Sequence, residues 1–162
     1  MRWHLSHRFD PRALPLANRH YNRQTPDSPQ FVPPGRCLVL LTKNADALWV
    51  TSWPEFAQHE WVGAWMNSLF RNEGAGLSSE LIIEAIAATR AHFGTPPSLG
   101  LVTFVDASKI RSTNPGCCYR KAGFARVGTT KKRERLVLQL LPDAMPAPVA
   151  AIGSQFALAG AA

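Results

Sequence analysis

The first half of the chain contains three apolar runs with the length and composition of β-strands. Residues 37–42 and 47–52 flank residues 43–46, whose Lys-Asn-Ala-Asp sequence has turn chemistry, and together they predict a β-hairpin. Residues 61–70 alternate large and small side chains. The pattern therefore predicts a hairpin followed by one further strand.

The second half of the chain mixes helical and extended patterns. Apolar residues recur at helical spacing from Leu77 to His92, and Gly94 stands where a C-cap glycine belongs. A continuous apolar run then ends at Asp106, as is typical of a buried central strand. The elements expected here are a helix at 77–93, a strand at 99–105, a short helix at 117–122, and a second hairpin with strands at 124–130 and 135–141. This order predicts an α+β domain with one mixed, mostly antiparallel central sheet flanked by helices.

Composition divides the chain into three parts. Residues 1–36 hold six of the 13 prolines, and they predict a basic, irregular segment that packs on the domain and contains one short helix around 12–21. Residues 37–141 carry the predicted sheet and helices. Residues 142–162 are rich in Pro and Ala and predict a poorly ordered tail. A length of 162 residues suits one domain of this kind.

Positive charge is concentrated in two blocks. The chain has 18 Lys and Arg, 13 of them Arg, against 11 Asp and Glu. The net charge is +4 over residues 1–36, −4 over 37–108 and +8 over 109–135. Such blocks are typical of contact with nucleic acid or a polyphosphate cofactor, although a solvated surface, or Lys that protects an edge hairpin, explains them as well. The candidate DNA contacts are Arg23, Arg111, Arg120, Lys121, Lys131, Lys132 and Arg133.

Several classes of protein are excluded by composition. A hydrophobic content of 46% excludes general disorder, and no apolar run approaches the roughly 20 residues of a membrane span. The N-terminus lacks the apolar core of a secretion signal. Three Cys and five scattered His show no metal-ligand spacing, and each His taken singly is typical of a surface or packing residue. We therefore expect a soluble, cytoplasmic protein with no metal site, disulfide framework or membrane partner.

Residues 71–76 form a glycine loop between the third predicted strand and the long helix. The N–H groups at a helix N-terminus lack internal partners and carry the positive end of the helix dipole, and glycines let an anion approach them. Ser78 and Ser79 can cap the helix or donate their hydroxyls to the same anion. A capped glycine turn that binds nothing also accounts for these residues. The candidate cofactor contacts are Arg71, Asn72, Gly74, Ala75, Gly76, Leu77 and Ser78.

The glycine loop and the residues near position 119 together resemble the GNAT superfamily of N-acetyltransferases. Its R/Q-x-x-G-x-G/A motif is matched by residues 71–76 and its Y-x-x-x-G-F motif by residues 119–124. The resemblance covers residues 37–141 and implies bound acetyl-CoA or a related acyl-CoA, with the strand at 99–106 splayed from its neighbour to admit the pantetheine arm. It also implies that Tyr119 protonates the departing thiolate, a role that suits a phenol with a pKa near 10. A packing role for Tyr119 stays open.

Other parts of the chain resemble, more narrowly, the Mom-like DNA-modification proteins of bacteriophages. This resemblance implies transfer of a carbamoylmethyl group to the N6 amine of adenine in DNA, which shields phage DNA from restriction. It makes Tyr21, Arg71, Ser78 or Ser79, and Asp106 the candidates for the reacting site. The matching runs are 20–23, 28–31, 33–35, 70–78 and 102–106.

The chemistry asked of these residues is coherent. An exocyclic aromatic amine is a poor nucleophile, and a carboxylate such as Asp106 can accept its proton as the new bond forms. A base in a duplex must leave the stack, so that an aromatic platform such as Tyr21 or Trp53 is useful in the pocket. The alternatives are that Asp106 caps the following loop and that Tyr21 only packs.

Three functions follow from these observations. The first is a transferase that modifies a base amine in DNA, with Asp106, Tyr119, Tyr21 and Ser79 as candidate catalytic residues. The second is an acetyl-CoA-dependent acetyltransferase that acts on a small-molecule or protein amine. The third is a catalytically silent module of the same fold that holds nucleic acid on its basic faces.

Overall fold

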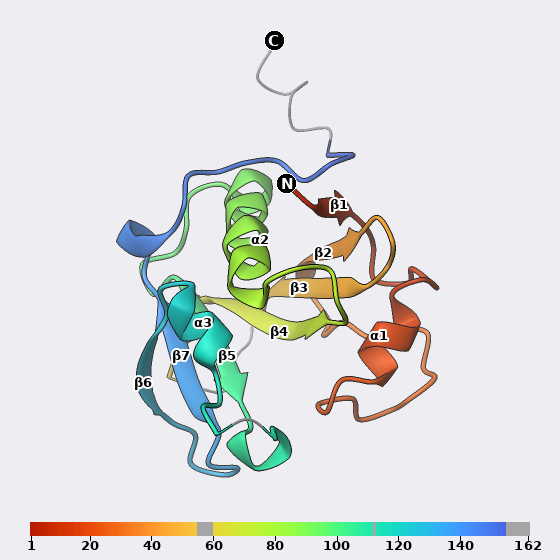
Figure 1. Cartoon of the computed structure of the whole chain (residues 1–162). Coiled ribbons are helices and arrows are strands. Elements are labelled where there is room, and N and C mark those ends of the chain that lie inside the picture. The colour runs from red at the N-terminus through yellow and green to blue at the C-terminus, as the bar shows by residue number, and fades with distance from the viewer. Residues whose placement is uncertain (55–59, 112, 155–162) are drawn as a thin grey trace.

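A computed structural model describes residues 1–54, 60–111 and 113–154 and contains one seven-stranded sheet (Figure 1). The strands lie in the order β1-β2-β3-β4-β5-β7-β6. Their bounds are β1 Trp3–Leu5, β2 Arg36–Thr42, β3 Ala47–Trp53, β4 Trp65–Asn72, β5 Leu101–Val105, β6 Ala125–Thr129 and β7 Leu136–Leu140. The helices are α1 Leu14–Asn18, α2 Ser78–Phe93 and α3 Cys117–Lys121, with 3₁₀ turns η1 Ala107–Lys109 and η2 Pro142–Ala144. The predicted α+β class with a mixed, mostly antiparallel sheet is confirmed.

The two predicted hairpins are present, and the first shows why its sequence forms a turn. Between β2 and β3, the N–H groups of Asp46 and Ala47 donate to the Thr42 hydroxyl oxygen at 3.1 and 2.9 Å. The side chain thus satisfies backbone donors that the turn leaves outside the ladder. Ala125–Thr129 and Leu136–Leu140 form the second hairpin in antiparallel register.

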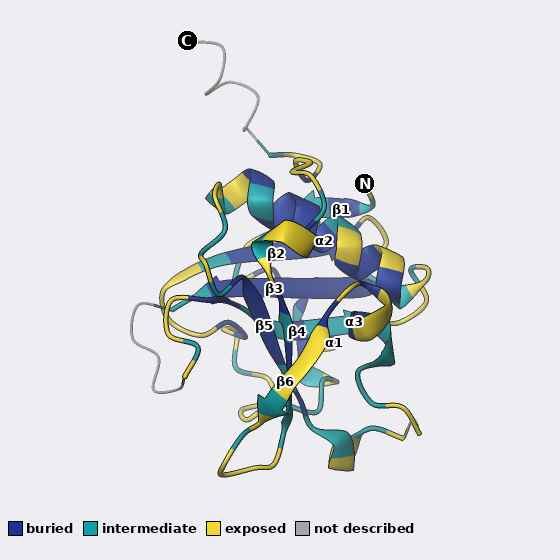
Figure 2. Cartoon of the chain, turned by 90° about the vertical axis from the view of Figure 1, so that its left-hand side faces the viewer, coloured by how far each residue is buried: buried dark blue, intermediate teal, exposed yellow. Residues whose placement is uncertain are grey.

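The long helix covers one face of the sheet. In Figure 1, α2 lies across β2, β3 and β4, and Figure 2 shows its inner side and the central strands buried. Trp3, Trp49 and Trp65 are fully buried in this core together with Leu81 and Ile86 of the helix. Because Ala, Leu and Ile recur on this side of α2, burial of apolar surface fixes the helix on the sheet.

A second core on the opposite face holds the N-terminal segment against the sheet. Leu16 and Ala17 of α1 and the later residues Phe31 and Val32 are buried with Val50 of β3. Residues 1–36 therefore pack on the domain, as predicted, and they place residues 20–33 beside β4.

The sheet divides at β4 and β5. These strands pair in parallel from Trp65↔Leu101 to Asn67↔Thr103, and all other strand pairs in the described chain are antiparallel. Beyond Asn67 and Thr103 the two strands run on without further pairing, which is the splay that the sequence analysis expected. A bulge lies at the same point, because Val50 pairs with Leu69 and Thr51 with Asn67, which leaves Ser68 as an extra residue.

Two strands in the first half of the chain differ from prediction. β1 was not predicted, because three residues are too short for a pattern, and it forms by pairing with β2. The third strand begins at Trp65 rather than 61, since the Ala64 N–H donates to the Trp61 carbonyl in a turn. Gly94 ends α2 as expected, with its N–H on the Arg90 carbonyl.

The prediction of a poorly ordered tail is wrong for residues 142–154. Met145 and Ala151 are buried in the main core, and the Val149 N–H donates to the Ala87 carbonyl at 3.1 Å. Ile152 exchanges backbone hydrogen bonds with β1. Residues 155–162 lie outside the described residues.

Candidate functional site

Three adjoining hollows open where β4 and β5 diverge. The polar hollow, of about 340 Å³, lies between β4 and residues 20–33. The apolar hollow, also of about 340 Å³, lies between β4, β5 and α3. A narrow central hollow shares lining residues with both, and His20 lines all three. Divergence of parallel strands at their carboxyl ends creates a crevice of the kind in which α/β sheets bind ligands.

Asn67 organises the point of divergence. Its amide nitrogen donates to the carbonyls of Val50 and Leu69 at 3.0 and 2.9 Å. Its Oδ1 accepts from the Tyr119 hydroxyl at 2.6 Å, and the Thr103 hydroxyl donates to its backbone carbonyl at 3.2 Å. One buried amide therefore ties β3, β4, β5 and α3 together. No sequence pattern indicates this role, because the partners of a polar residue within a strand do not follow from its position in the sequence.

Tyr119 lies inside this network. Its ring is buried, lines the apolar and central hollows, and meets Phe70 and Phe124 edge-on at 6.2 and 5.3 Å. Burial raises its pKa well above 10. The packing that the sequence analysis left open is present, and the hydroxyl stays protonated at neutral pH, so Tyr119 is a proton donor in the ground state.

Tyr21 lies on the opposite wall of the central hollow. Its hydroxyl oxygen accepts from the Asp106 backbone N–H at 3.4 Å, and its ring stacks on His20 at 4.5 Å. Burial raises the pKa of Tyr21. The structure thus brings Tyr21 and Tyr119 to one hollow from distant parts of the sequence, with the Asp106 backbone beside them. The Asp106 side chain is not among the described residues that line the three hollows.

His20 is a site residue that its sequence spacing did not indicate. Its Nδ1 accepts from the Asn22 N–H at 3.1 Å, which assigns the ring proton of the neutral form to Nε2. Burial, followed by the charge of Arg71, lowers the pKa of His20 to about 4. His20 is therefore neutral at pH 7, and the one sequence signal for it is its place beside Tyr21 in the run 20–23.

The His20 pKa predicts a pH dependence of stability. Between about pH 6.5 and 4 the folded chain binds fewer protons at His20 than the unfolded chain, so the free energy of unfolding falls as the pH is lowered through this window. At about 1.4 kcal/mol per pKa unit, discounted for partial exposure, we expect a loss of about 2 kcal/mol. Urea unfolding of the wild type and His20→Gln at pH 7 and pH 4 measures it.

The matched control is His92→Gln on the exposed end of α2, where burial lowers the pKa by a smaller amount. The loss between pH 7 and pH 4 should be smaller in His20→Gln than in the wild type and in His92→Gln. Equal losses in all three proteins would show that His20 does not titrate as described.

Asp106 follows β5 and caps η1. Its Oδ1 accepts from both the N–H and the hydroxyl of Ser108, at 3.1 and 2.5 Å. The Ser108 bond is the main cause that lowers the pKa of Asp106, and the charges of Lys109 and Arg135 add to it. The capping role is confirmed. Its role as a proton acceptor stays a prediction, and Oδ2 is the oxygen assigned to that role.

Trp53 does not belong to the site. It packs edge-on against Trp65 and Phe93, and the Arg36 guanidinium lies 4.0 Å from its ring centre. It is not among the described residues that line the three hollows. Tyr21 is therefore the better placed of the two aromatic platforms suggested by the sequence.

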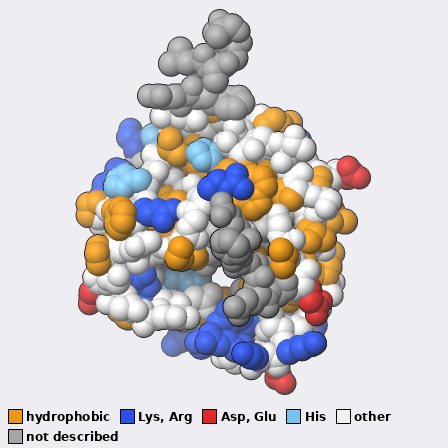
Figure 3. Space-filling model, turned by 180° about the vertical axis from the view of Figure 1, so that it is seen from behind, with side chains coloured by type: hydrophobic (Ala, Val, Ile, Leu, Met, Phe, Trp, Pro, Cys, Tyr) orange, Lys and Arg blue, Asp and Glu red, His pale blue; other side chains and the backbone are white. Residues whose placement is uncertain are grey.

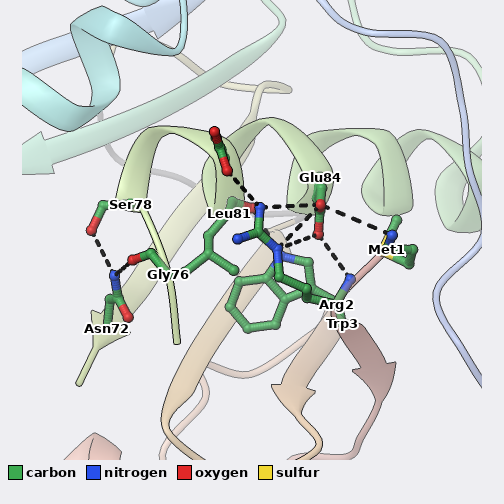
Figure 4. A network of polar contacts seen from close by, with 9 residues as sticks. Met1, Arg2, Trp3, Asn72, Gly76, Ser78, Leu81 and Glu84 are labelled. Carbon is green, nitrogen blue, oxygen red and sulfur yellow. Dashed lines mark hydrogen bonds and ion pairs between the residues drawn. The ribbon is translucent and has the colours of Figure 1, made fainter. Parts of the chain in front are cut away.

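The glycine loop is organised by Asn72. Its Oδ1 accepts from the N–H groups of Gly74 and Ala75, and its amide nitrogen donates to the Gly76 carbonyl and the Ser78 hydroxyl (Figure 4). Gly74 has a φ of 105°, and a Cβ there would meet open space, so the loop leaves its outer side accessible. No side chain caps α2, whose N-cap is Leu77.

Neither serine caps α2, which was one of the two roles predicted for them. Ser78 bonds Asn72, and Ser79 is buried under the first turn of α2, so neither caps the helix. Ser79 also does not line any of the three hollows within the described chain. The helical pattern sets this outcome, because Ser79 falls on the face of α2 that meets the sheet, together with Ile82 and Ile86.

Arg71 and Arg2 flank the glycine loop in ion pairs. Arg71 pairs with Glu73 and donates to the Arg19 carbonyl at 2.8 Å, and Arg19 pairs with the same carboxylate. Hydrogen bonds from Arg19 and then Arg71 lower the pKa of Glu73 to about 2. This ion pair ties the loop to α1, which differs from the free anion contact predicted for Arg71.

On the other side of the loop, the Arg2 guanidinium donates to Glu80 and Glu84 of α2 (Figure 4). A Cβ at Gly76 would lie 2.5 Å from Arg2 Nη1, so glycine is required there for this approach. Arg2 is 74 positions from Gly76 in the sequence, and only the formation of β1 brings them together.

Most of the predicted DNA contacts are exposed. Lys131, Lys132 and Arg133 occupy the turn between β6 and β7, and Figure 3 shows basic side chains gathered at the lower end of the molecule, where this turn lies. Arg111, Arg120 and Lys121 are also exposed. Arg23 instead donates to Asn18 Oδ1 and to the carbonyls of Ser28 and Gln30, so its role in the described chain is to shape the loop 20–33.

Comparison of the chain with protein-family models, curated proteins and solved structures gives no match. Within the described residues, no helix is both long and apolar enough to cross a membrane. No group of three His, Cys, Asp or Glu side chains with the proximity of metal ligands occurs in that same part of the chain. Function must therefore be inferred from the hollows and their residues.

Proposed function

We propose that the chain is a group transferase that modifies the exocyclic N6 amine of adenine in DNA. The observation that carries the proposal is that Tyr21 and Tyr119 line one hollow at the divergence of β4 and β5, and that the Asp106 backbone N–H bonds to Tyr21 beside it. The hollows on the two sides of this point differ in polarity, as two chemically different substrates require. The resemblance to the Mom-like proteins supports adenine as the acceptor.

The glycine loop and the apolar hollow fit an acyl-CoA donor. The loop has an accessible outer side at Gly74 and an uncapped helix N-terminus, which suit a pyrophosphate. The apolar hollow is lined by Phe70, Val105 and Ile110, which suit an alkyl-amide arm. A bound acyl-CoA would supply an activated acyl carbon and a thiolate leaving group, which corresponds to an N6-acyl product rather than the carbamoylmethyl group of the Mom-like proteins.

The chain's own residues supply the proton transfers. In this mechanism Asp106 Oδ2 accepts a proton from the attacking amine, and its low pKa makes it a weak base. The Tyr119 hydroxyl, held by Asn67 Oδ1, keeps a proton that it can give to a leaving thiolate. Tyr21 contributes an aromatic wall between the two hollows.

The charge of the chain supports a DNA substrate. The charges of Lys109 and Arg135 lower the pKa of Asp106, and the charge of Arg135 also favours a lower pKa of Tyr21. Both cations therefore lie near the crevice. Arg135 Nε is buried and has no partner among the described residues. Together with Lys131–Arg133, these cations would contact phosphates on either side of a base in the crevice.

Asp106→Asn tests the proposed proton acceptor. The amide keeps the acceptor oxygen for Ser108 but cannot take the proton, so we expect a 10- to 100-fold fall in the rate of adenine modification with nearly unchanged DNA affinity. This fall in rate is smaller than that expected for a general base whose pKa lies near the working pH, because the Asp106 carboxylate is weakly basic. Mass spectrometry of nucleosides from DNA treated with each protein measures the rate.

Asp143→Asn is the control, since Asp143 is exposed on η2. It should retain the wild-type rate. A rate for Asp106→Asn equal to that of the control would remove Asp106 from the mechanism.

A conventional acetyl-CoA-dependent acetyltransferase of a small-molecule or protein amine is the second candidate. The glycine loop and the apolar hollow serve it equally well, because neither contacts the acceptor. Thermal stabilisation by acetyl-CoA combined with no affinity for DNA would favour this function over the first.

A further inference from the structure

The polar hollow contains two buried polar atoms without partners. Asn22 Oδ1 and Ser68 Oγ are inaccessible to solvent and bond to none of the described residues. Both residues line the polar hollow, and both also line the central hollow beside Tyr21 and Tyr119. Two unsatisfied groups therefore lie at the junction that leads to the reacting residues.

The local structure explains why these groups stay unpaired. Ser68 is the extra residue of the β4 bulge, which takes its side chain out of the regular pattern of the strand. Asn22 is held through its backbone, whose N–H donates to His20 Nδ1, and the following Arg23 fixes the loop through Asn18, Ser28 and Gln30. Buried polar groups without partners cost free energy, so a native structure that retains two of them at one cavity indicates a ligand-binding role.

We propose that the polar hollow is the pocket for the target adenine, and that Asn22 and Ser68 read the edge of the base. This inference rests on the proposed function and assigns its substrate pocket. A carboxamide offers an acceptor and a donor side by side, which matches the amino group and the neighbouring ring nitrogen of adenine. The Ser68 hydroxyl serves as either donor or acceptor.

The size and lining of the hollow suit an extruded base. Its volume of about 340 Å³ lies in the range of small-molecule sites. Neutral His20 and Phe31 supply aromatic surface against which a flipped base can stack. An amino group held at Asn22 Oδ1 lies on the side of the central hollow, where Tyr21 and Tyr119 face it.

The same geometry predicts discrimination among bases. Guanine and thymine present a carbonyl oxygen where adenine presents its amino group, and that oxygen would face Asn22 Oδ1. The site would then keep an unpaired acceptor, which is how buried polar groups reject the wrong ligand.

Binding of single-stranded oligonucleotides tests the assignment without the transfer reaction. Fluorescence anisotropy at fixed salt compares a thymine oligonucleotide that contains one central adenine with the same strand that contains thymine throughout. A single strand removes the cost of opening a duplex. We expect the wild type to bind the adenine strand about 10-fold more tightly.

Asn22→Leu and Ser68→Ala should each reduce this preference to less than about 3-fold, with unchanged affinity for the thymine strand. Each change removes an unpaired buried group, so neither should lower Tm. A merely structural role for these residues would instead predict a lower Tm in both variants. Asn44→Leu, a matched change at an exposed position in the turn between β2 and β3, should retain the preference. No adenine preference in the wild type, or a full preference in both variants, would overturn the assignment.

These outcomes are distinguishable from failure of the proposed function. Adenine preference that is lost in the variants, without any modified nucleoside, would uphold the pocket and remove the transferase activity. If both variants modify adenine and keep the wild-type preference, the transferase activity is upheld and the pocket assignment is removed.

Discussion

Replacement of Asn67 with alanine is expected to lower the free energy of unfolding by about 3–5 kcal/mol. The change removes the amide donor from the Val50 and Leu69 carbonyls and the acceptor from the Tyr119 hydroxyl, all in the interior. The loss of a buried hydrogen-bond partner costs about 1–3 kcal/mol, with partial relief by relaxation. Urea unfolding monitored by tryptophan fluorescence measures the loss.

Thr103→Val is the matched control for this prediction. It removes one hydroxyl from the same network and keeps the shape of the side chain, so it should cost only about 1 kcal/mol. A loss for Asn67→Ala no greater than that for Thr103→Val would mean that the amide does not join the strands as described.

The largest expected effect on activity is that of Tyr119→Phe, which should lower the rate of adenine modification by about 100- to 1,000-fold. The variant keeps the packed ring but loses the proton that the mechanism assigns to the leaving thiolate. Its stability should fall by only about 1 kcal/mol, the worth of one hydrogen bond, so unfolding cannot explain the loss of rate. Rates from nucleoside mass spectrometry and stability from urea unfolding separate the two effects.

The chain has two tyrosines, and Tyr21→Phe is the natural comparison. It keeps the stack on His20 and loses only a long hydrogen bond from the Asp106 N–H, so we expect a fall of less than 10-fold. A Tyr119→Phe variant as active as Tyr21→Phe would limit Tyr119 to packing.

Local patterns in the sequence were sufficient for most of the sheet. Turn residues and the periodicity of apolar residues act over a few positions. They determine the hairpin of β2 and β3, the amphipathic α2 and the apolar β5. The resemblances made Tyr21, Asp106 and Tyr119 site candidates, and the structure places Tyr21 and Tyr119 in one hollow with the Asp106 backbone beside them.

Contacts between distant segments could not be predicted in the same way. β1 exists because Trp3 fills the core and its indole N–H donates to the Leu81 carbonyl, neither of which shows in a three-residue pattern. The position of the tail depends on β1, since the Ile152 backbone hydrogen-bonds to that strand. Arg2 beside Gly76 is a further consequence of the same pairing.

The residues missed in the site share this cause. Asn67 and Ser68 acquire their roles from the bulge in β4, and His20 from burial beside Arg71. Each is a single polar residue whose importance depends on partners that lie far away in the sequence.

Mass spectrometry of nucleosides from the DNA of cells that express the chain tests the central claim most directly. With wild-type protein, donor and host factors present, we predict a deoxyadenosine of increased mass that falls by at least 100-fold in cells expressing Tyr119→Phe at the same level. Only unmodified deoxyadenosine in cells that contain the folded wild-type protein would contradict the claim that the crevice between β4 and β5 transfers a group to adenine.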